Sequence, residues 1–264
     1  MVKKISGFPA LSCLAAGLLL VALPTHAEVK QGAAVVKTLT GTASSVDAFG
    51  FSHPLRIGSV VKPGETVQTG ANSTVDFFLD QNGPGIGLNP QSTLRFDQLT
   101  YEQSALGTVI ATRLDLRQGA LFGTVKKLAA GSRFEVKTPQ GVATVRGTEF
   151  YIDAQQGTLY VVTGTVLVHL VLNLDTGGTL NKDVSVGSGQ YLSIPKAGSM
   201  QLWNNLAATP FSSKITATSL ARLATLGQLM GPLSGTSATE VFGASTAGNS
   251  VHIDKPPTSI TVSP

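Results

Sequence analysis

The sequence predicts an all-β protein, and three observations support this. From about Val35 to Ile194, short runs rich in Val, Thr, Leu and Phe alternate with Gly, Pro, Asn and Asp, as in strands joined by tight turns. Glycines recur at the ends of these runs, where chain reversals need backbone angles that other residues avoid. Only one later stretch has helical periodicity. We therefore expect many short strands in a twisted sandwich or β-solenoid-like module, with one C-terminal helix.

The strands are expected in order along this region. The clearest is Thr74–Leu79, whose alternate apolar residues share one face. Asp80-Gln81-Asn82-Gly83 then provides a turn, because Asn-Gly tolerates positive φ. The further predicted strands are Thr93–Leu99, Thr108–Leu116, Ala120–Val125, Phe134–Thr138, Val142–Val145, Thr148–Ile152, Leu159–Val162, Val166–Leu172 and Tyr191–Ile194. No fixed repeat period is visible, so the sequence leaves sandwich and solenoid open.

Residues 1–27 have the features of a signal peptide. Lys3 and Lys4 give a positive start, and the apolar run that follows is densest over 14–23. Thr25-His26-Ala27 then places small residues at a cleavage site. We expect cleavage after Ala27, which predicts a periplasmic or secreted protein with no membrane span. A retained membrane anchor is the alternative, because the apolar run is nearly long enough to cross a bilayer.

Composition excludes several classes of site. Cys13 is the only cysteine and lies within the predicted signal, so the mature chain would have no disulfide, thiolate metal site or cysteine nucleophile. The net charge is only +4 and the basic residues are scattered, whereas a nucleic-acid groove requires clustered cations. We therefore expect no nucleic-acid partner.

The C-terminal quarter divides into a helical segment and a tail. Ser213 can cap a helix over 214–230, in which Ile215 and four leucines recur near one face before Gly231-Pro232 ends it. Small and polar residues dominate Leu233–Pro264, which we expect to be disordered. The expected domains are a signal peptide at 1–27, a β domain at 35–195, a segment at 196–231 with the helix 214–230, and a tail at 232–264.

No pattern of residues predicts catalysis. The histidines remaining after cleavage, His53, His169 and His252, lack metal-ligand spacing, and His169 is expected to face outward from its strand. No Gly-x-Ser-x-Gly elbow is present. The carboxylates that qualify for acid–base chemistry by type alone are Asp97, Glu102, Asp115, Glu135, Glu149 and Asp153. Because such residues usually lie on solvated strand faces, we expect no enzyme activity, no metal and no cofactor.

The most informative stretch runs from Thr138 to Phe150. Arg146 is the charged residue of this stretch that we consider for a functional role, and Gly147 follows it directly. We expect Gly147 to occupy a backbone angle forbidden to side chains and to form a β-bulge. Arg146 either braces that bulge, for example through Glu149, or contacts a partner. The candidate site residues, in a structural or partner-binding role, are Thr138, Pro139, Val145, Arg146, Gly147, Thr148 and Phe150.

This stretch resembles the signature of the FecR domain family, and further pieces in order resemble the rest of it. The matching pieces are Leu55–Gly70, Pro90–Leu94, Leu116–Gly119, Phe134–Pro139, Gly164–Val166 and Gly189-Gln190. The resemblance spans about Val35 to Ile194. It implies an all-β periplasmic module, known from bacterial cell-surface signalling, with a role in binding or scaffolding.

The sequence also departs from FecR-type regulators. The resemblance implies that such regulators combine a cytoplasmic anti-sigma segment, a transmembrane helix and a periplasmic domain. We expect no cytoplasmic segment before the predicted signal here, and therefore no anti-sigma function. The leading hypothesis is a stand-alone, exported, non-enzymatic FecR-domain protein that binds an envelope protein or surface polymer. The alternative is a structural or adhesive surface protein whose β body is a spacer.

Overall fold

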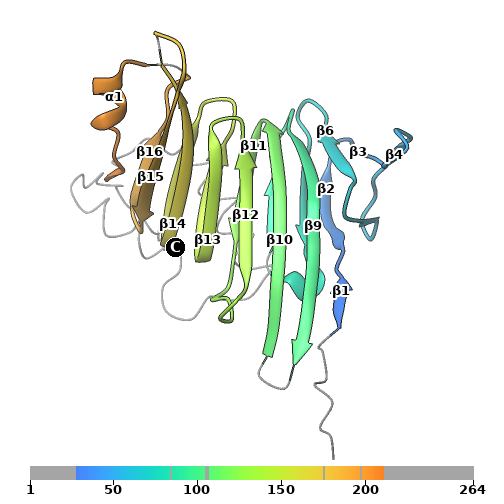
Figure 1. Cartoon of the computed structure of the whole chain (residues 1–264). Coiled ribbons are helices and arrows are strands. Elements are labelled where there is room, and N and C mark those ends of the chain that lie inside the picture. The colour runs from blue at the N-terminus through green and yellow to red at the C-terminus, as the bar shows by residue number, and fades with distance from the viewer. Residues whose placement is uncertain (1–27, 84, 105–106, 175, 197, 211–264) are drawn as a thin grey trace, which may run out of the picture.

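Strands make up most of the protein (Figure 1). The computed structural model describes residues 28–83, 85–104, 107–174, 176–196 and 198–210. Its strands are β1 (Val29–Gln31), β2 (Ala34–Thr40), β3 (Ala43–Val46), β4 (Ser52–Pro54), β5 (Val60–Val61), β6 (Thr66–Thr69), β7 (Thr74–Phe78), β8 (Gly85–Leu88), β9 (Thr93–Ser104), β10 (Gly107–Gln118), β11 (Ala120–Thr124), β12 (Arg133–Thr138), β13 (Gly141–Asp153), β14 (Thr158–Asn173), β15 (Thr179–Gly187), β16 (Gln190–Ser193) and β17 (Thr209–Pro210). A 3₁₀ turn, η1, spans Asp80–Asn82, and a short helix, α1, spans Met200–Asn204.

The strands form one connected, curled sheet whose two halves face each other as layers. The first layer contains β1, β9, β10, β12 and β15, and the second contains β2, β7, β8, β11 and β16. The long strands β13 and β14 belong to both. The first half of β13 pairs with β12, with Thr144 opposite Glu135, and its second half pairs with β11, with Glu149 opposite Thr124.

A bend in β13 and β14 makes this sharing possible. The register of the pair shifts between Arg146 and Glu149. Gly147 and Gly164 lie at the bend with φ of 65° and 84°, angles that favour glycine. A Cβ on Gly164 would lie 2.3 Å from the backbone oxygen of Gly147, so the two strands approach too closely there for any side chain. The predicted bulge at Gly147 is therefore present.

The predicted strand limits were wrong at these two glycines. We expected separate strands at Val142–Val145 and Thr148–Ile152, and again at Leu159–Val162 and Val166–Leu172. Each pair is instead one continuous strand, β13 or β14. The reason is that a glycine with positive φ ends a strand at a turn but only bends it at a bulge.

The predicted all-β class is confirmed, and the structure has features of both expected architectures, the sandwich and the solenoid. Most neighbouring strands are antiparallel, as in a sandwich. However, the chain passes from β10 in the first layer to β11 in the second and returns as β12, which pairs parallel to β10 from Ala111 opposite Arg133 to Asp115 opposite Lys137. This path corresponds to one turn of a β-solenoid within a fold whose strands are otherwise largely antiparallel.

The core lies between the layers. Phe77 of β7 meets Phe96 of β9 edge-to-face with ring centroids 5.5 Å apart, and Phe134 of β12 meets Phe150 of β13 at 6.5 Å. All four rings are fully buried. Since each pair joins one strand of the first layer to one of the second, these contacts hold the layers together.

Several expectations concern other parts of the chain. The signal peptide at 1–27, the helix 214–230 and the tail 232–264 lie outside the described residues. Within the described part, the strands that were not predicted individually are β1 to β6, β8, β15 and β17, and the helix α1 was not predicted either. Strands β1 and β17 lie beyond the expected limits 35–195. No helix among the described residues is long and apolar enough to cross a membrane.

We predict that Gly164→Ala destabilises the protein more than Gly58→Ala. Both glycines have positive φ, so either substitution incurs strain of about 1–2 kcal/mol. A new Cβ at Gly58 meets nothing within 4 Å, whereas at Gly164 it meets backbone and forces the strands apart. Urea unfolding of the two variants measures the difference. Equal losses of unfolding free energy would contradict a close approach at the bend.

Candidate functional site

The residues of the predicted signature divide between a turn and the core. Thr138 closes the turn between β12 and β13, where its Oγ1 donates to the carbonyl of Gly141 at 3.2 Å and accepts from the N–H of Gln140 at 3.3 Å. Pro139 is exposed at the tip of this turn. Val145, Thr148 and Phe150 are fully buried. Most of the signature therefore shapes the fold.

Arg146 and Glu149 do not form the contact that we gave as one way of bracing the bulge. Arg146 is exposed, and the two described residues form no ion pair with each other. The bend at Gly147 lies between them, so Arg146 belongs to the first half of β13 and Glu149 to the half that pairs with β11. Glu149 is buried opposite Thr124 of β11, and this burial raises the pKa of its carboxyl above the ordinary value.

A cavity of about 430 Å³ lies beside the signature turn. It is formed where the turns after β10, β12 and β13 meet the ends of β14 and β16. Its described lining includes carboxamides and cations but no carboxylate: Gln118, Gln140, Gln155, Asn173, Arg117 and Lys196. Gln140 is held in place because its Nε2 donates to the carbonyl of Ala154 at 3.0 Å. The size and lining suit a small ligand that accepts hydrogen bonds.

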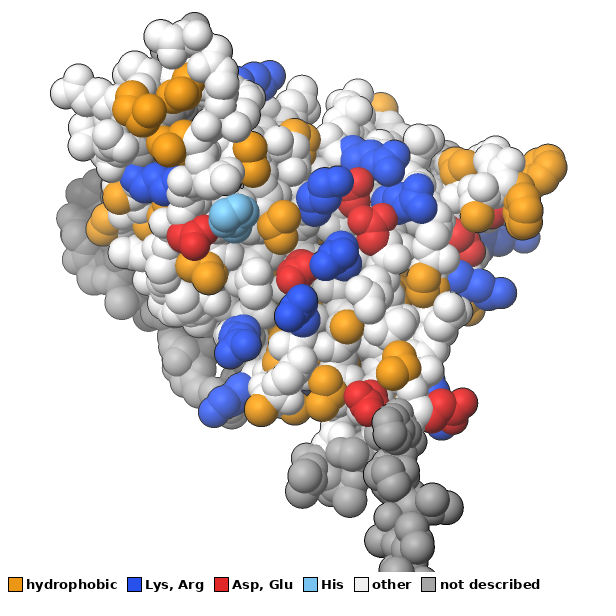
Figure 2. Space-filling view, viewed as in Figure 1, with side chains coloured by type: hydrophobic (Ala, Val, Ile, Leu, Met, Phe, Trp, Pro, Cys, Tyr) orange, Lys and Arg blue, Asp and Glu red, His pale blue; other side chains and the backbone are white. Residues whose placement is uncertain are grey.

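Four strongly exposed apolar side chains lie on the segment from the β3–β4 loop to the start of β5. Phe49 and Phe51, in the loop between β3 and β4, are 87% and 66% exposed. Ile57, in the loop after β4, and Val60, the first residue of β5, are 70% and 52% exposed. We call these four residues the hairpin patch. In Figure 2 hydrophobic side chains project at the end of the molecule where Figure 1 places β3 and β4. Sequence reasoning missed this patch.

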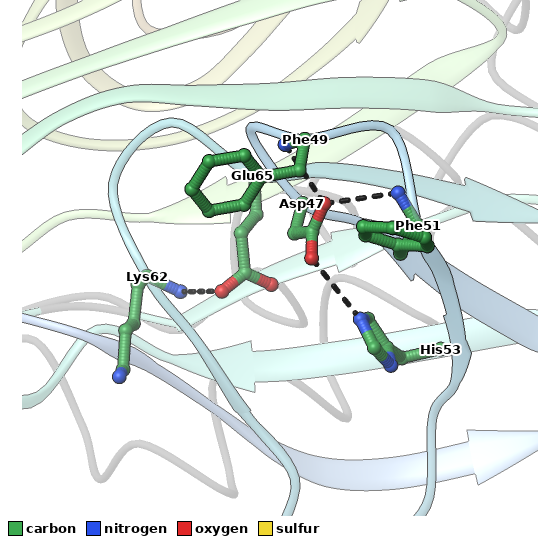
Figure 3. A network of polar contacts seen from close by, with 6 residues as sticks. All are labelled: Asp47, Phe49, Phe51, His53, Lys62 and Glu65. Atoms are coloured by element: carbon green, nitrogen blue, oxygen red, sulfur yellow. Dashed lines mark hydrogen bonds and ion pairs between the residues drawn. The ribbon is translucent and has the colours of Figure 1, made fainter.

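Asp47 fixes the loop that carries the two phenylalanines (Figure 3). Its Oδ1 accepts from the N–H groups of Phe49 and Phe51, both at 2.9 Å, and its Oδ2 lies 3.3 Å from Nε2 of His53. Burial alone would raise the pKa of Asp47, but the hydrogen bonds from Phe51, His53 and Phe49 outweigh it and lower that pKa. The exposed rings therefore stand on an ordered loop.

On the face of the molecule that Figure 2 shows, cations and anions are interspersed. Glu135 pairs with Arg113 at 3.1 Å, and Asp115 pairs with Arg117 at 3.1 Å. His169 is exposed, as predicted, and its Nδ1 lies beside the carboxylate of Asp183. Among the described residues no group of three His, Cys, Asp or Glu side chains could hold a metal ion.

Comparison with known proteins shows which family part of the chain is similar to. A model of the FecR protein family matches residues 65–167. No curated protein matches the sequence. Two crystal structures of a "putative anti-sigma factor" from Parabacteroides distasonis are similar at 16% and 15% identity, with TM-scores of 0.37 and 0.41. They align with 55% and 60% of this chain, which spans 57% and 64% of theirs, less than two thirds in each case.

We predict that acid releases the hairpin loop. Because the folded-state pKa of Asp47 is depressed, its stabilising bonds are fully present above the ordinary aspartate pKa of about 3.9 and are lost as pH falls through the lower folded value. The amide resonances of Phe49 and Phe51 should therefore titrate together in NMR spectra, with a midpoint below 3.9. Asp47→Asn should abolish this titration. A shared midpoint above 3.9 would show that the carboxylate does not hold the loop.

Proposed function

We propose that this chain, which carries a FecR domain, is an exported, non-enzymatic binding protein of the bacterial cell envelope. The FecR domain supports a role related to cell-surface signalling, and its family is typically associated with the envelope. Proteins of the FecR type generally interact with other envelope proteins. The features at 1–27 support export, because they combine a basic start, an apolar run and a small-residue cleavage site.

The observation that carries the binding role is the hairpin patch. Large aromatic side chains that are mostly exposed to water, as Phe49 and Phe51 are, are unfavourable for a lone soluble domain, and groups of exposed apolar side chains mark interaction sites. The loop that presents Phe49 and Phe51 is also ordered by Asp47 before any partner arrives. Pre-organisation of this kind reduces the entropy lost on binding.

The surroundings of the patch indicate the chemistry of the partner. Lys62 lies near the hairpin loop (Figure 3). Both Arg56, which precedes Ile57, and Lys62, two residues after Val60, are exposed. The carboxylate of Glu65 accepts a bond from the backbone N–H of Lys62, which leaves the ammonium group pointing elsewhere. We infer a protein partner with an apolar hollow for the phenylalanines and acidic groups at its rim.

A non-enzymatic role is supported by the state of the carboxylates. Asp115 and Glu135, which qualified by type for acid–base catalysis, each lie within ion-pair distance of two cations on an open sheet face. The buried Glu149 has no second carboxylate opposite it, since its neighbours across the strands are Thr124 and Thr163. Neither setting provides a pair of carboxylates converging on a substrate.

We predict that Phe49→Ser with Phe51→Ser abolishes capture of the envelope partner. Loss of two central aromatic anchors usually weakens an interface at least a hundredfold, by about 3 kcal/mol or more. The test is affinity purification from envelope extract, followed by mass spectrometry of one stoichiometric protein. Because both rings are exposed, the double variant should keep the melting temperature of the parent protein.

The matched control is Leu167→Ser with Val171→Ser. These residues are also partly exposed, at 49% and 45%, but lie on β14 away from the hairpin. The control should capture the partner normally. If the hairpin variant captures the partner as well as the control does, the hairpin patch is not the binding surface. Recovery of a surface polymer instead of a protein would favour the spacer or adhesive role.

A further inference from the structure

The outer face of the second layer, which points away from the core, carries a row of aromatic rings. Phe122, Tyr151, Tyr160 and Tyr191 lie directly opposite one another on β11, β13, β14 and β16. Consecutive ring centroids are 4.7, 5.9 and 5.4 Å apart. We call these four residues the aromatic row. It forms one continuous apolar strip across four neighbouring strands.

Part of this outer face is buried although it does not belong to the main core, whereas Tyr151 and Tyr191 are half-buried. Leu121 belongs to the core cluster between the layers, so its neighbour Phe122 points the opposite way, yet Phe122 has no exposed surface. Tyr160 is only 8% exposed and Thr124 only 1%. In the described part of the chain, the main contacts of β11 are with β8 and β13, its neighbours within the sheet. A strand buried on both faces requires a cover on each.

The neighbouring strand β8 extends the space available for a cover. Gly85 and Gly87 occupy its outward positions, opposite Thr124 and Phe122 of β11, so they place no side chains on the outer face. Beyond β8, Asp76 of β7 lies opposite Gly87. From β16 to β7 the face spans five strand spacings, or about 24 Å.

The chain leaves the described region at one end of this face. Strand β17 pairs with β16, and Thr209 lies directly opposite Tyr191, the last ring of the aromatic row. Residues 211–264 follow Pro210. The segment 214–230 therefore begins a few residues from the row, well within the reach of an extended chain.

The sequence of this segment fits the face. Its apolar residues, Ile215, Leu223, Leu226 and Leu229 among them, recur near one side of a helix, and a helix over 214–230 is about 25 Å long. That length matches the width of the outer face. We propose that the segment 214–230 packs its leucine side across the outer face of the second layer, over the aromatic row and the glycines of β8.

A second observation supports a cover that brings hydrogen-bond donors. In the described structure the Oε2 of Glu149 and the Oγ1 of Thr124 are buried without a hydrogen-bond partner. Glu149 and Thr124 lie opposite each other beside the aromatic row. Unpartnered buried oxygens are costly, and a covering segment with its own donors relieves that cost. The segment 214–230 carries Lys214 and Arg222.

The test measures whether the outer face is covered in the full exported chain. Cys13 is the only native cysteine, so a Cys13→Ser background with Thr124→Cys has a single thiol on the outer face. Its reaction rate with N-ethylmaleimide is compared in three chains: the parent, Leu223→Asp with Leu226→Asp, and Ala217→Asp with Ala224→Asp. The alanines lie on the opposite side of the same predicted helix and provide equal added charge.

We predict slow labelling in the parent and in the alanine control, and labelling at least tenfold faster in the leucine variant. Tyr191→Cys provides a second probe at the edge of the row. Val75→Cys, at a core position with no exposed surface, should stay unlabelled in all three chains and so reports that the fold is intact. Fast labelling of Thr124→Cys in the parent would overturn the proposal. Equally slow labelling in an intact leucine variant would also overturn it. A labelling rate of Thr124→Cys in the parent that rises when the protein is diluted would also overturn it, because a second copy of the chain would then be the cover.

Discussion

The close approach of Gly147 and Gly164 is the constraint on which the rest of the structure depends. Their positive φ angles bend β13 and β14, so that one half of each strand lies in each layer. Without the bend, Phe150 would not face Phe134 across the core, and β11 and β12 would not pair with the same strand. The segment from Val145 to Thr148 is therefore required by the backbone path itself.

This explains how the candidate site residues divide. The matched FecR region, 65–167, contains the bend, both aromatic pairs between the layers and the parallel return from β10 to β12. The loop with Phe49 and Phe51 precedes that region. In our proposal a shared scaffold is thus combined with a binding surface outside it, and partner choice can change without any change at the bend.

Local pattern predicted the all-β class and several strands, but not the short N-terminal strands, the continuity of the long strands or the strand partners. Alternation of polar and apolar residues identified Thr74–Leu79 and Phe134–Thr138, although in β7 the polar Asp76 is buried as well as its apolar neighbours. The strands at Gly147 and Gly164 were divided wrongly, since a glycine at a bulge and a glycine at a turn look alike in sequence. The parallel pairing of β10 with β12 depends on a path through the other layer, which no short pattern encodes.

The candidate site was harder to predict for a related reason. Phe49 and Phe51 read like any apolar residues of a strand, and only their position on the outermost hairpin leaves them in water. Asp47 offered one signal, because aspartate often accepts bonds from backbone N–H groups two residues further on. A contact between Arg146 and Glu149, one of the possibilities left open, is absent because the bend at Gly147 places these residues in different halves of β13.

Native-state hydrogen exchange, followed by mass spectrometry at increasing urea, tests the central claim most directly. If the bent strands join both layers into one unit, the slowest amides of β10 and β12 in the first layer and of β8 and β11 in the second should open together. They should then share one opening free energy and one dependence on urea. Separate opening of the layers, with one exchanging at a lower free energy and a smaller urea dependence, would contradict the account.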